Sequence, residues 1–251
     1  MTTSTDLART GAVTDEFDHA AAAYDRLVAA HPGYHRDLRT SVRRLALPGP
    51  GTGLRLLDLG CGTGASTTAL LEAFPTARIV GVDASPGMLE VAEAKQWPSN
   101  VTFHRARAEE MTPERVGELL EGPADAVLCA YLIRNLPDPD VLLASVRALL
   151  RPGGRLALHE YSVADSLPAR AVWNTVCWGV IIPAGRALTG RSDLFRHLWR
   201  SVLEFDGRTA LLARMRAAGL ESVADAPLPG WRYGITHTFV GRRPLEGSDE
   251  R

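Results

Sequence analysis

The chain has 251 residues, 45% of them hydrophobic, which is enough to form the core of one large α/β domain or two small ones. A formal net charge of −1 provides no overall positive field, so the composition argues against nucleic acid as a partner and favours a small molecule. The three cysteines are widely spaced and form no CxxC pair, which indicates neither a disulfide framework nor a zinc site and favours a reducing cytoplasm.

The two ends of the chain are polar and show no apolar periodicity. We therefore expect residues 1–14 and 244–251 to be disordered. The N-terminal end also lacks the basic start and the apolar stretch of a signal peptide, so a cytoplasmic location is predicted. Between the two ends, residues 15–243 are predicted to form a single domain.

Two helices are predicted at the start of this domain, over residues 15–47. From Phe17 onward the apolar residues follow helical spacing. Phe17 and Tyr24 are either core residues of this first helix or part of a lid over a ligand. The apolar residues expected on the second helix are Leu38, Val42 and Leu45.

Short apolar segments alternate with segments of helical spacing over residues 54–160. The apolar segments are rich in Val, Leu and Ile without polar alternation, as expected when helices cover both faces of a parallel sheet. The pattern therefore predicts an α/β fold with a doubly wound, mostly parallel sheet. The expected strands are 54–59, 78–83, 101–104, 126–129 and 155–160, and the expected helices are 65–73, 87–95, 113–120 and 140–150.

The alternation stops after Tyr161, where an aromatic-rich segment, 161–207, is predicted to be an inserted substrate cap. Its most apolar stretch, 172–183, is about half as long as a membrane-spanning helix, so we predict a buried or substrate-facing segment. The tryptophans of the cap are expected in its core or in a pocket wall. Residues 208–243 then complete a seven-stranded sheet with a helix at 209–218 and strands at 220–224 and 235–241.

The strongest motif is a glycine-rich turn, DLGCGTG at 58–64, between an apolar strand and a helix. Glycines let the backbone turn sharply and approach a ligand, and ligands of open α/β sheets bind at the carboxyl ends of the strands. Asp58 would then face a cationic or amino group. Asp83 ends the next strand, where a carboxylate can accept hydrogen bonds from both hydroxyls of a ribose.

A glycine-rich turn of this kind also occurs in NAD-binding domains, so the turn alone does not decide the ligand. The turn lacks the usual GxGxxG spacing, and no Walker lysine follows it. An acidic residue at its start suits a methionine ammonium better than a pyrophosphate. Binding through nucleotide phosphates is therefore disfavoured.

Together with LRPGGRL at 150–156, these motifs resemble the class I S-adenosylmethionine-dependent methyltransferases. The resemblance implies a Rossmann-like methyltransferase fold and S-adenosyl-L-methionine as the cofactor. The histidines show no metal-ligand spacing, so no metal is assigned. Within that superfamily the chain is similar to the ubiquinone/menaquinone biosynthesis C-methyltransferases. The segments that carry this second resemblance are FD at 17–18, YD at 24–25, IRN at 133–135, HEYS at 159–162, IPAG at 182–185 and SVLEF at 201–205.

The resemblance also implies a set of cofactor-binding residues. Met88 would flank the adenine and Ala130 would line the methionine end. Two positions depart from the family pattern: Arg107 stands where an Asp or Asn is usual, and Leu132 replaces a glycine and should narrow the pocket. Both departures indicate a divergent substrate. The expected cofactor-binding residues are Asp58, Gly60, Gly62, Thr63, Gly64, Asp83, Ala84, Met88, Arg107, Ala108 and Ala130.

Three residues are candidates for the chemistry, Arg134, His159 and Tyr24. Arg134 could stabilise a phenolate, although it could equally cap the following turn or pair with Asp138 or Asp140. His159 is either a structural histidine or an acid/base group. Tyr24 would help to close the site over the substrate.

The reaction expected from the resemblance is methyl transfer to a small aromatic acceptor, with C-methylation of a quinol or phenol as the leading hypothesis. An isoprenoid tail of the acceptor could lie along the apolar cap. The alternatives are an O-, N- or C-methyltransferase of specialised metabolism, or a protein of this fold that binds the cofactor without transferring methyl. Peripheral contact with a membrane and a homodimer are left open.

Overall fold

The computed structural model describes residues Ala21 and Asp25 and the ranges 32–190 and 192–247. The predictions for residues 1–14, for the helix starting at Phe17 and for Tyr24 lie outside the described residues. Residues 244–247, at the predicted disordered C-terminal end, contain neither helix nor strand.

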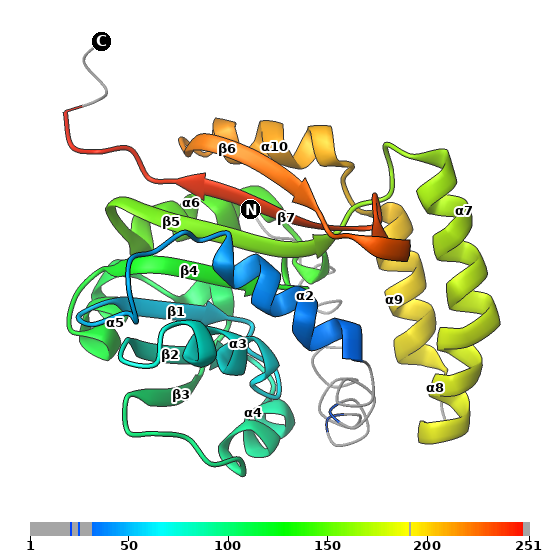
Figure 1. The fold of residues 1–251 in the computed structure, drawn as a ribbon, viewed down its shortest axis with the longest axis horizontal. Coiled ribbons are helices and arrows are strands. Elements are labelled where there is room, and N and C mark those ends of the chain that lie inside the picture. The colour runs from blue at the N-terminus through cyan, green and yellow to red at the C-terminus, as the bar shows by residue number, and fades with distance from the viewer. Residues whose placement is uncertain (1–20, 22–24, 26–31, 191, 248–251) are drawn as a thin grey trace.

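The described residues form one seven-stranded sheet with the strand order β3-β2-β1-β4-β5-β7-β6 (Figure 1). The strands are β1 (Arg55–Leu59), β2 (Arg78–Asp83), β3 (Val101–Arg105), β4 (Ala124–Ala130), β5 (Leu150–Tyr161), β6 (Glu221–Pro227) and β7 (Thr236–Arg242). β1 to β5 run parallel, and β7 pairs antiparallel with both β5 and β6. The chain reverses its direction of travel across the sheet after β3, so β1 and β4 become neighbours. Ligands of open α/β sheets bind at this switch point.

Helices cover both faces of the sheet, as the apolar strands predict (Figure 1). One face packs against α2 (Pro32–Arg43) and α3 (Ala65–Ala73), and the opposite face packs against α5 (Pro113–Leu120), α6 (Pro139–Leu149) and α10 (Arg208–Ala217). α4 (Pro86–Glu93) lies beside β2 and β3. Short 3-10 turns complete the core at η1 (Ala108–Glu110), η2 (Ile133–Asn135) and η4 (Gly230–Arg232).

Several of the described helices begin with the same local signal, a polar cap followed by proline. The capping side chain accepts a hydrogen bond from a backbone N–H of the first turn, and proline fits where no intrahelical N–H bond is needed. This signal fixes where the helix starts, which is why α5 begins where the sequence predicts. The caps are Ser85, Thr112, Asp138 and Ser166.

The cap is helical and lies beyond the carboxyl ends of the parallel strands (Figure 1). It comprises α7 (Leu167–Val176), the π-helical turn η3 (Cys177–Ile181), α8 (Ile182–Thr189) and α9 (Asp193–Glu204). Its own apolar core is centred on Trp173, which is 1% exposed. No helix in the described part of the chain is long and apolar enough to cross a membrane.

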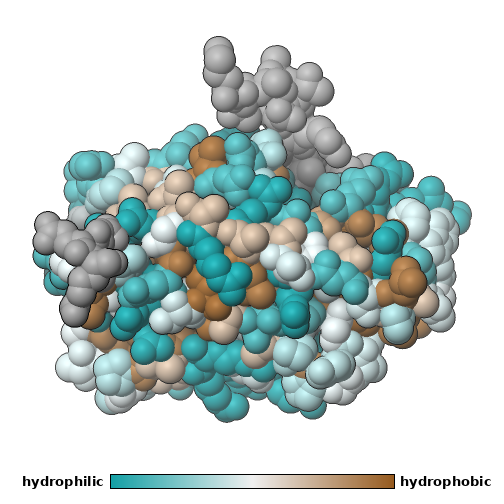
Figure 2. Space-filling view, turned by 90° about the horizontal axis from the view of Figure 1, so that it is seen from above, coloured by the Kyte–Doolittle hydropathy of each residue, from teal (hydrophilic) through white to brown (hydrophobic). Residues whose placement is uncertain are grey.

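Two sequence-based expectations are wrong in detail. Leu45 is buried but follows the end of α2 at Arg43 rather than lying on the helix. The stretch 172–183 is not uniformly buried or substrate-facing, because Trp178 is 51% exposed and Val180 is 60% exposed. Figure 2 shows apolar surface at the end of the molecule that carries the cap, among mostly hydrophilic residues.

Candidate active site

The glycine-rich turn closes the carboxyl end of β1 against β2. The backbone N–H groups of Gly60 and Cys61 both donate to the carbonyl oxygen of Val82, at 2.8 and 3.0 Å. Gly60 has a φ of 76°, and a Cβ added there would lie 3.0 Å from the Leu132 side chain. The positive φ therefore favours glycine at this position, and a larger residue would also press against Leu132.

Asp83 is held in place by the turn it faces. The N–H of Gly62 donates to its Oδ2 at 2.8 Å, and the N–H of Ser85 donates to its Oδ1 at 2.9 Å. A carboxylate has two acceptor oxygens, each with two lone pairs, so its chemistry suits the two hydroxyls of a ribose. The geometry keeps Asp83 as the candidate ribose-binding residue.

Asp58 lies behind the turn and does not line the cavity. Its Oδ2 accepts hydrogen bonds from the hydroxyls of Ser66 (2.7 Å) and Thr67 (2.6 Å), which tie the end of β1 to the first turn of α3. Its Oδ1 is buried and has no hydrogen-bond partner among the described residues. Burial raises the pKa of this carboxyl to about 6, with Asp83 adding to the rise and the two hydroxyls opposing it.

One cavity extends from the turn to the cap, and it brings together most of the expected cofactor-binding residues. Asp58 has a buried oxygen without a hydrogen-bond partner among the described residues, which fits the ammonium of a sulfonium nucleoside. The carboxylate of Asp83 fits the ribose of the same ligand. Gly64 does not line the cavity; it begins α3 against the ring of Trp97. The expected residues that line the cavity are Gly60, Gly62, Thr63, Asp83, Ala84, Met88, Arg107, Ala108 and Ala130.

Arg107 lies in the cavity wall where its backbone leads into η1. Its N–H donates to the Glu110 carboxylate at 3.2 Å. No acidic or amide side chain from this position is available for an adenine amine, so any contact there falls to the backbone, as its departure from the family pattern predicts. Leu132 also lines the cavity, where it lies over Gly60.

The other half of the cavity is aromatic. Tyr34 stacks on Tyr131 with ring centroids 5.5 Å apart, and Tyr131 lies 4.8 Å from the ring of Tyr161. The guanidinium of Arg134 lies over both of the last two rings, at 5.7 and 5.5 Å from their centroids. These groups, with Asn135, form a wall suited to a flat, oxygen-bearing ring.

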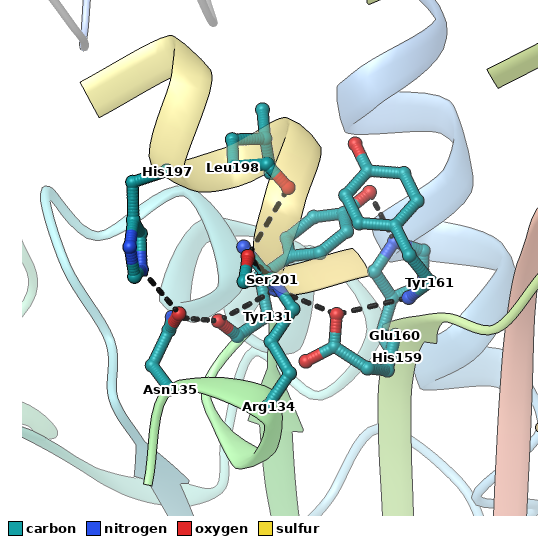
Figure 3. A network of polar contacts seen from close by, with 9 residues as sticks. All are labelled: Tyr131, Arg134, Asn135, His159, Glu160, Tyr161, His197, Leu198 and Ser201. Atoms are coloured by element: carbon teal, nitrogen blue, oxygen red, sulfur yellow. Dashed lines mark hydrogen bonds and ion pairs between the residues drawn. The ribbon is translucent and has the colours of Figure 1, made fainter. Parts of the chain in front are cut away.

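Arg134 is paired with a carboxylate that the sequence did not single out for the site. Its Nη1 donates to Glu160 Oε1 at 2.6 Å and to the Tyr131 carbonyl at 3.0 Å (Figure 3). Asp138 instead caps α6, and Asp140 pairs with Arg214, so neither is the partner of Arg134. Burial raises the pKa of Glu160, and Arg134 opposes that rise.

His159 lies behind the aromatic wall rather than in it. Its Nε2 is 2.8 Å from the hydroxyl of Tyr131, and its Nδ1 is 2.7 Å from the hydroxyl of Ser41 on α2. The side chain is fully buried and does not line the cavity. Burial, together with nearby Arg232, lowers its pKa to about 3. Tyr131 therefore lies between His159 and the cavity.

Lys95, the single lysine of the chain, connects the N-terminal segment to the glycine-rich turn. Its Nζ donates to Asp25 Oδ1 at 2.7 Å and to the carbonyl oxygen of Thr63 at 2.8 Å. The hydrogen bonds of Lys95 and Thr63 lower the pKa of Asp25 against the opposing effect of burial. This bridge is the described contact through which the segment predicted as a lid reaches the cofactor half of the cavity.

Sequence reasoning missed several cavity residues. Tyr131 and Tyr161 carry a signal that could have found them, because Tyr131 directly follows β4 and Tyr161 ends β5 at the edge of the sheet where ligands bind. Tyr34 on α2 and His197 on α9 carry none, because only tertiary contacts bring these helices to the sheet. Cys61 also lines the cavity, and burial raises the pKa of its thiol, so it is suited to packing as a small apolar residue rather than to acting as a nucleophile.

Relatives of the chain are methyltransferases over nearly its full length. The ubiquinone/menaquinone biosynthesis C-methyltransferase UbiE of Syntrophotalea carbinolica is 32% identical over 238 residues, covering 92% of this chain and 94% of the relative. The demethylmenaquinone methyltransferase of Thermus thermophilus is 31% identical over 228 residues, covering 91% of this chain and all of the relative.

Solved structures agree with the fold. A SAM-dependent methyltransferase of Thermotoga maritima has a TM-score of 0.63 at 19% identity, covering 92% of this chain and 99% of that chain. A chain from the complex of the Haloferax volcanii Trm112 methyltransferase activator with a methyltransferase has a TM-score of 0.66 at 19% identity, covering 93% and 98%. Because residues 3–241 match the ubiE/COQ5 methyltransferase family, the chain belongs to that family and is an S-adenosylmethionine-dependent methyltransferase.

Proposed function

We propose that the chain transfers a methyl group to a ring carbon of a quinol or a related phenol. The observation that carries the proposal is the continuity of the cavity, in which the glycine-rich turn and Asp83 share one space with the aromatic wall of Tyr34, Tyr131 and Tyr161. The relatives named for C-methylation in ubiquinone and menaquinone biosynthesis support the same acceptor class.

The bound cofactor supplies an electrophilic methyl group on a sulfonium. The protein has to exclude water and align the acceptor carbon with that methyl, and the cap and the aromatic wall are placed for both tasks. Loss of the proton from a ring hydroxyl raises the electron density at the neighbouring carbon. Arg134 lies at the cavity wall, where its charge would favour the phenolate, although Glu160 already shares that charge. The new carbon–carbon bond would form as the methyl carbon separates from sulfur, and the ring carbon would then lose its proton to water, which restores aromaticity.

Roles for the individual residues follow from their positions in the cavity. Asp83 would hold the ribose, Met88 the adenine and Ala130 the methionine end. Asp58 would act from behind the turn, on an ammonium placed against its open Oδ1. Arg134 would act on the acceptor oxygen. Tyr24 stays a prediction, since it lies outside the described residues.

Two residues of the cavity support an alternative function with a different acceptor. Leu132 lies over Gly60 and occupies space beside the turn, and Arg107 replaces an adenine-binding side chain. These departures support an O-, N- or C-methyltransferase of specialised metabolism acting on a smaller phenol.

An isoprenoid tail and peripheral contact with a membrane are proposed from the cap. Trp178 and Val180 are exposed, and no acidic residue occurs between Ser166 and Ser192. The exposed apolar side chains would contact an apolar tail, and a surface without acidic residues would bind anionic lipid.

The proposal is tested with labelled methyl donor and a panel of quinols and phenols under anaerobic conditions. We expect label to enter 1,4-dihydroxynaphthalene or a related quinol, and nuclear magnetic resonance of the product to place the methyl on carbon. Label on oxygen or nitrogen would select the alternative. An Asp83→Ala variant is the control, because it should lose transfer to every acceptor. Binding of the donor without transfer to any acceptor would contradict the proposal.

A further inference from the structure

Tyr131 has an unusual backbone at the point where β4 ends. Its φ is 57°, a conformation that residues other than glycine rarely adopt and that costs free energy. Its N–H nevertheless donates to the carbonyl of His159 at 2.8 Å, which continues the pairing of β4 with β5. Strained residues of this kind persist where the surrounding structure holds them, often at functional sites. Here the strained residue lines the cavity between its two halves.

The hydroxyl of Tyr131 is fixed by a buried chain of polar groups. His159 Nε2 lies 2.8 Å from it, and on the other side of the ring Nδ1 lies 2.7 Å from Ser41 (Figure 3 shows the His159 end). Ser41 lies 2.6 Å from the hydroxyl of Thr238, which also accepts a hydrogen bond from Arg44 at 2.8 Å. The chain therefore joins α2, β5 and β7 to the hydroxyl of a residue that lines the cavity.

The imidazole in this chain stays neutral. Burial disfavours its charged form, and the arginines that face it, Arg232, Arg44 and Arg134, act in the same direction. A neutral imidazole has one donor and one acceptor nitrogen. If Nε2 carries the hydrogen, Nε2–H donates a hydrogen bond to the Tyr131 oxygen. If Nδ1 carries it, the Tyr131 hydroxyl donates to Nε2. A phenol has one donor hydrogen and two acceptor lone pairs, so one hydrogen bond to His159 does not use its whole capacity. In both arrangements His159 orients the hydroxyl and takes no net proton.

We infer that Tyr131 binds a ring oxygen of the methyl acceptor through its hydroxyl, and that His159 is a positioning residue acting through Tyr131. The inference rests on the proposed function, since it needs an acceptor that carries a ring oxygen. It replaces the direct acid/base role considered for His159. It also accounts for the strained backbone of Tyr131. In this conformation the side chain contacts both the acceptor half of the cavity and the buried chain of polar groups.

Binding of two ring compounds tests the inference without any need for turnover. We would measure the affinities of 1,4-dihydroxynaphthalene and naphthalene by fluorescence quenching, anaerobically and with S-adenosylhomocysteine present. The informative quantity is the ratio of the two affinities, which a general loss of packing would not change in the same way. We expect the wild type to prefer the hydroxylated ring and Tyr131→Phe to lose about 3- to 10-fold of that preference.

Two further variants complete the design. Tyr233→Phe is the matched control, because Tyr233 is 71% exposed and does not line the cavity, so its ratio should equal that of the wild type. Ser41→Ala leaves the cavity wall intact and removes the Nδ1 partner of His159. It should reduce the ratio by a smaller factor, about 2- to 3-fold, through a less firmly oriented hydroxyl.

The outcomes separate the inference from the proposed function. A ratio that is unchanged in Tyr131→Phe, or a wild type that does not prefer the hydroxylated ring, overturns the inference. If the ratio falls as expected while the wild type transfers methyl to no acceptor, the proposed function fails and the role of Tyr131 in binding stands. If Ser41→Ala matches the wild type, the positioning role of the chain is overturned.

Discussion

Arg134 and Glu160 form a buried ion pair, with Nη1 and Oε1 2.6 Å apart and side chains only 5% and 1% exposed. The pair joins η2, which follows β4, to the end of the neighbouring strand β5. It holds the guanidinium over the rings of Tyr131 and Tyr161. Because Glu160 Oε2 has no hydrogen-bond partner among the described residues, the pair has room for one more donor. The position of Arg134 in the cavity therefore depends on a carboxylate one layer behind it.

Removing that carboxylate should cost stability as well as activity. We expect Glu160→Ala to lower the free energy of unfolding by about 3 kcal/mol, because it leaves a buried guanidinium without its counter-charge. Glu160→Gln should cost less, since an amide oxygen can still accept from Nη1. Urea unfolding measures both. The control is Glu221→Ala at the half-exposed pair with Arg242, where about 1 kcal/mol or less is expected. Equal losses at the two positions would show that the Arg134 pair is not special.

Cofactor affinity should depend on pH through Asp58. Its pKa in the free protein is raised to about 6, so the carboxyl is largely neutral at pH 5 and ionised at pH 7. A ligand ammonium attracts only the ionised form, so affinity for S-adenosylhomocysteine should rise about tenfold from pH 5 to pH 7 and then level off. Calorimetry in several buffers measures this. Asp58→Asn should bind more weakly with no such slope, and a flat wild-type profile would mean that the ammonium does not sense Asp58.

The side chain of Arg107 should contribute little to cofactor affinity. We expect Arg107→Ala to change the affinity for S-adenosylhomocysteine by less than about threefold, because the position contributes through its backbone. Asp83→Ala should weaken the same affinity by a hundredfold or more, by about 3 kcal/mol, since it removes a charged acceptor for two hydroxyls. Calorimetry compares the two variants directly. A large loss in Arg107→Ala would show that the guanidinium itself binds the cofactor.

The sheet could be predicted from the sequence because its signals are local. β2, α3 and α5 have the bounds that their apolar runs and capping residues predict. The glycine-rich turn and Asp83 were equally readable, because a fixed distance along the chain places them at the same edge of a parallel sheet.

The acceptor half of the cavity could not be predicted from the sequence, because its residues come from distant segments of the chain. Tyr34 meets Tyr131 only after α2 packs on the sheet, and Glu160 meets Arg134 across two strand ends. The position of Asp58 was only partly readable for a similar reason. Spacing shows that a carboxylate stands at the start of the turn, but it does not show that two hydroxyls of α3 donate to one of its oxygens or that the side chain lies behind the turn rather than in the cavity wall.

The bridge formed by Lys95 predicts a link between the N-terminal segment and cofactor binding. Lys95→Met should raise the KM for S-adenosylmethionine about threefold, since it frees both Asp25 and the carbonyl of Thr63. Asp25→Asn should give a similar rise. The double variant should equal either single one, because all three remove the same bridge. Additive effects in steady-state kinetics would show that the two residues act separately.

Truncation of two tryptophans of the cap should destabilise the protein to different extents, although their sequence contexts are similar. Both lie in the apolar stretch 172–183, whose apolar residues surround the helix on all sides and so do not indicate a buried face. Trp173 is 1% exposed within the cap core and donates from Nε1 to the Trp199 carbonyl at 3.3 Å, whereas Trp178 is 51% exposed and touches the edge of the Trp199 ring.

Trp173→Ala should therefore lower the free energy of unfolding by about 3–5 kcal/mol, through lost burial and the cavity left behind. Trp178→Ala should cost about 1 kcal/mol or less, because most of its surface already meets water. Urea unfolding of the two variants checks the difference. Trp178→Glu extends the test to the proposed lipid contact, since it should leave stability unchanged and reduce sedimentation with anionic phospholipid vesicles. Equal destabilisation by the two alanine variants would contradict the burial of Trp173 in the cap core and the exposure of Trp178.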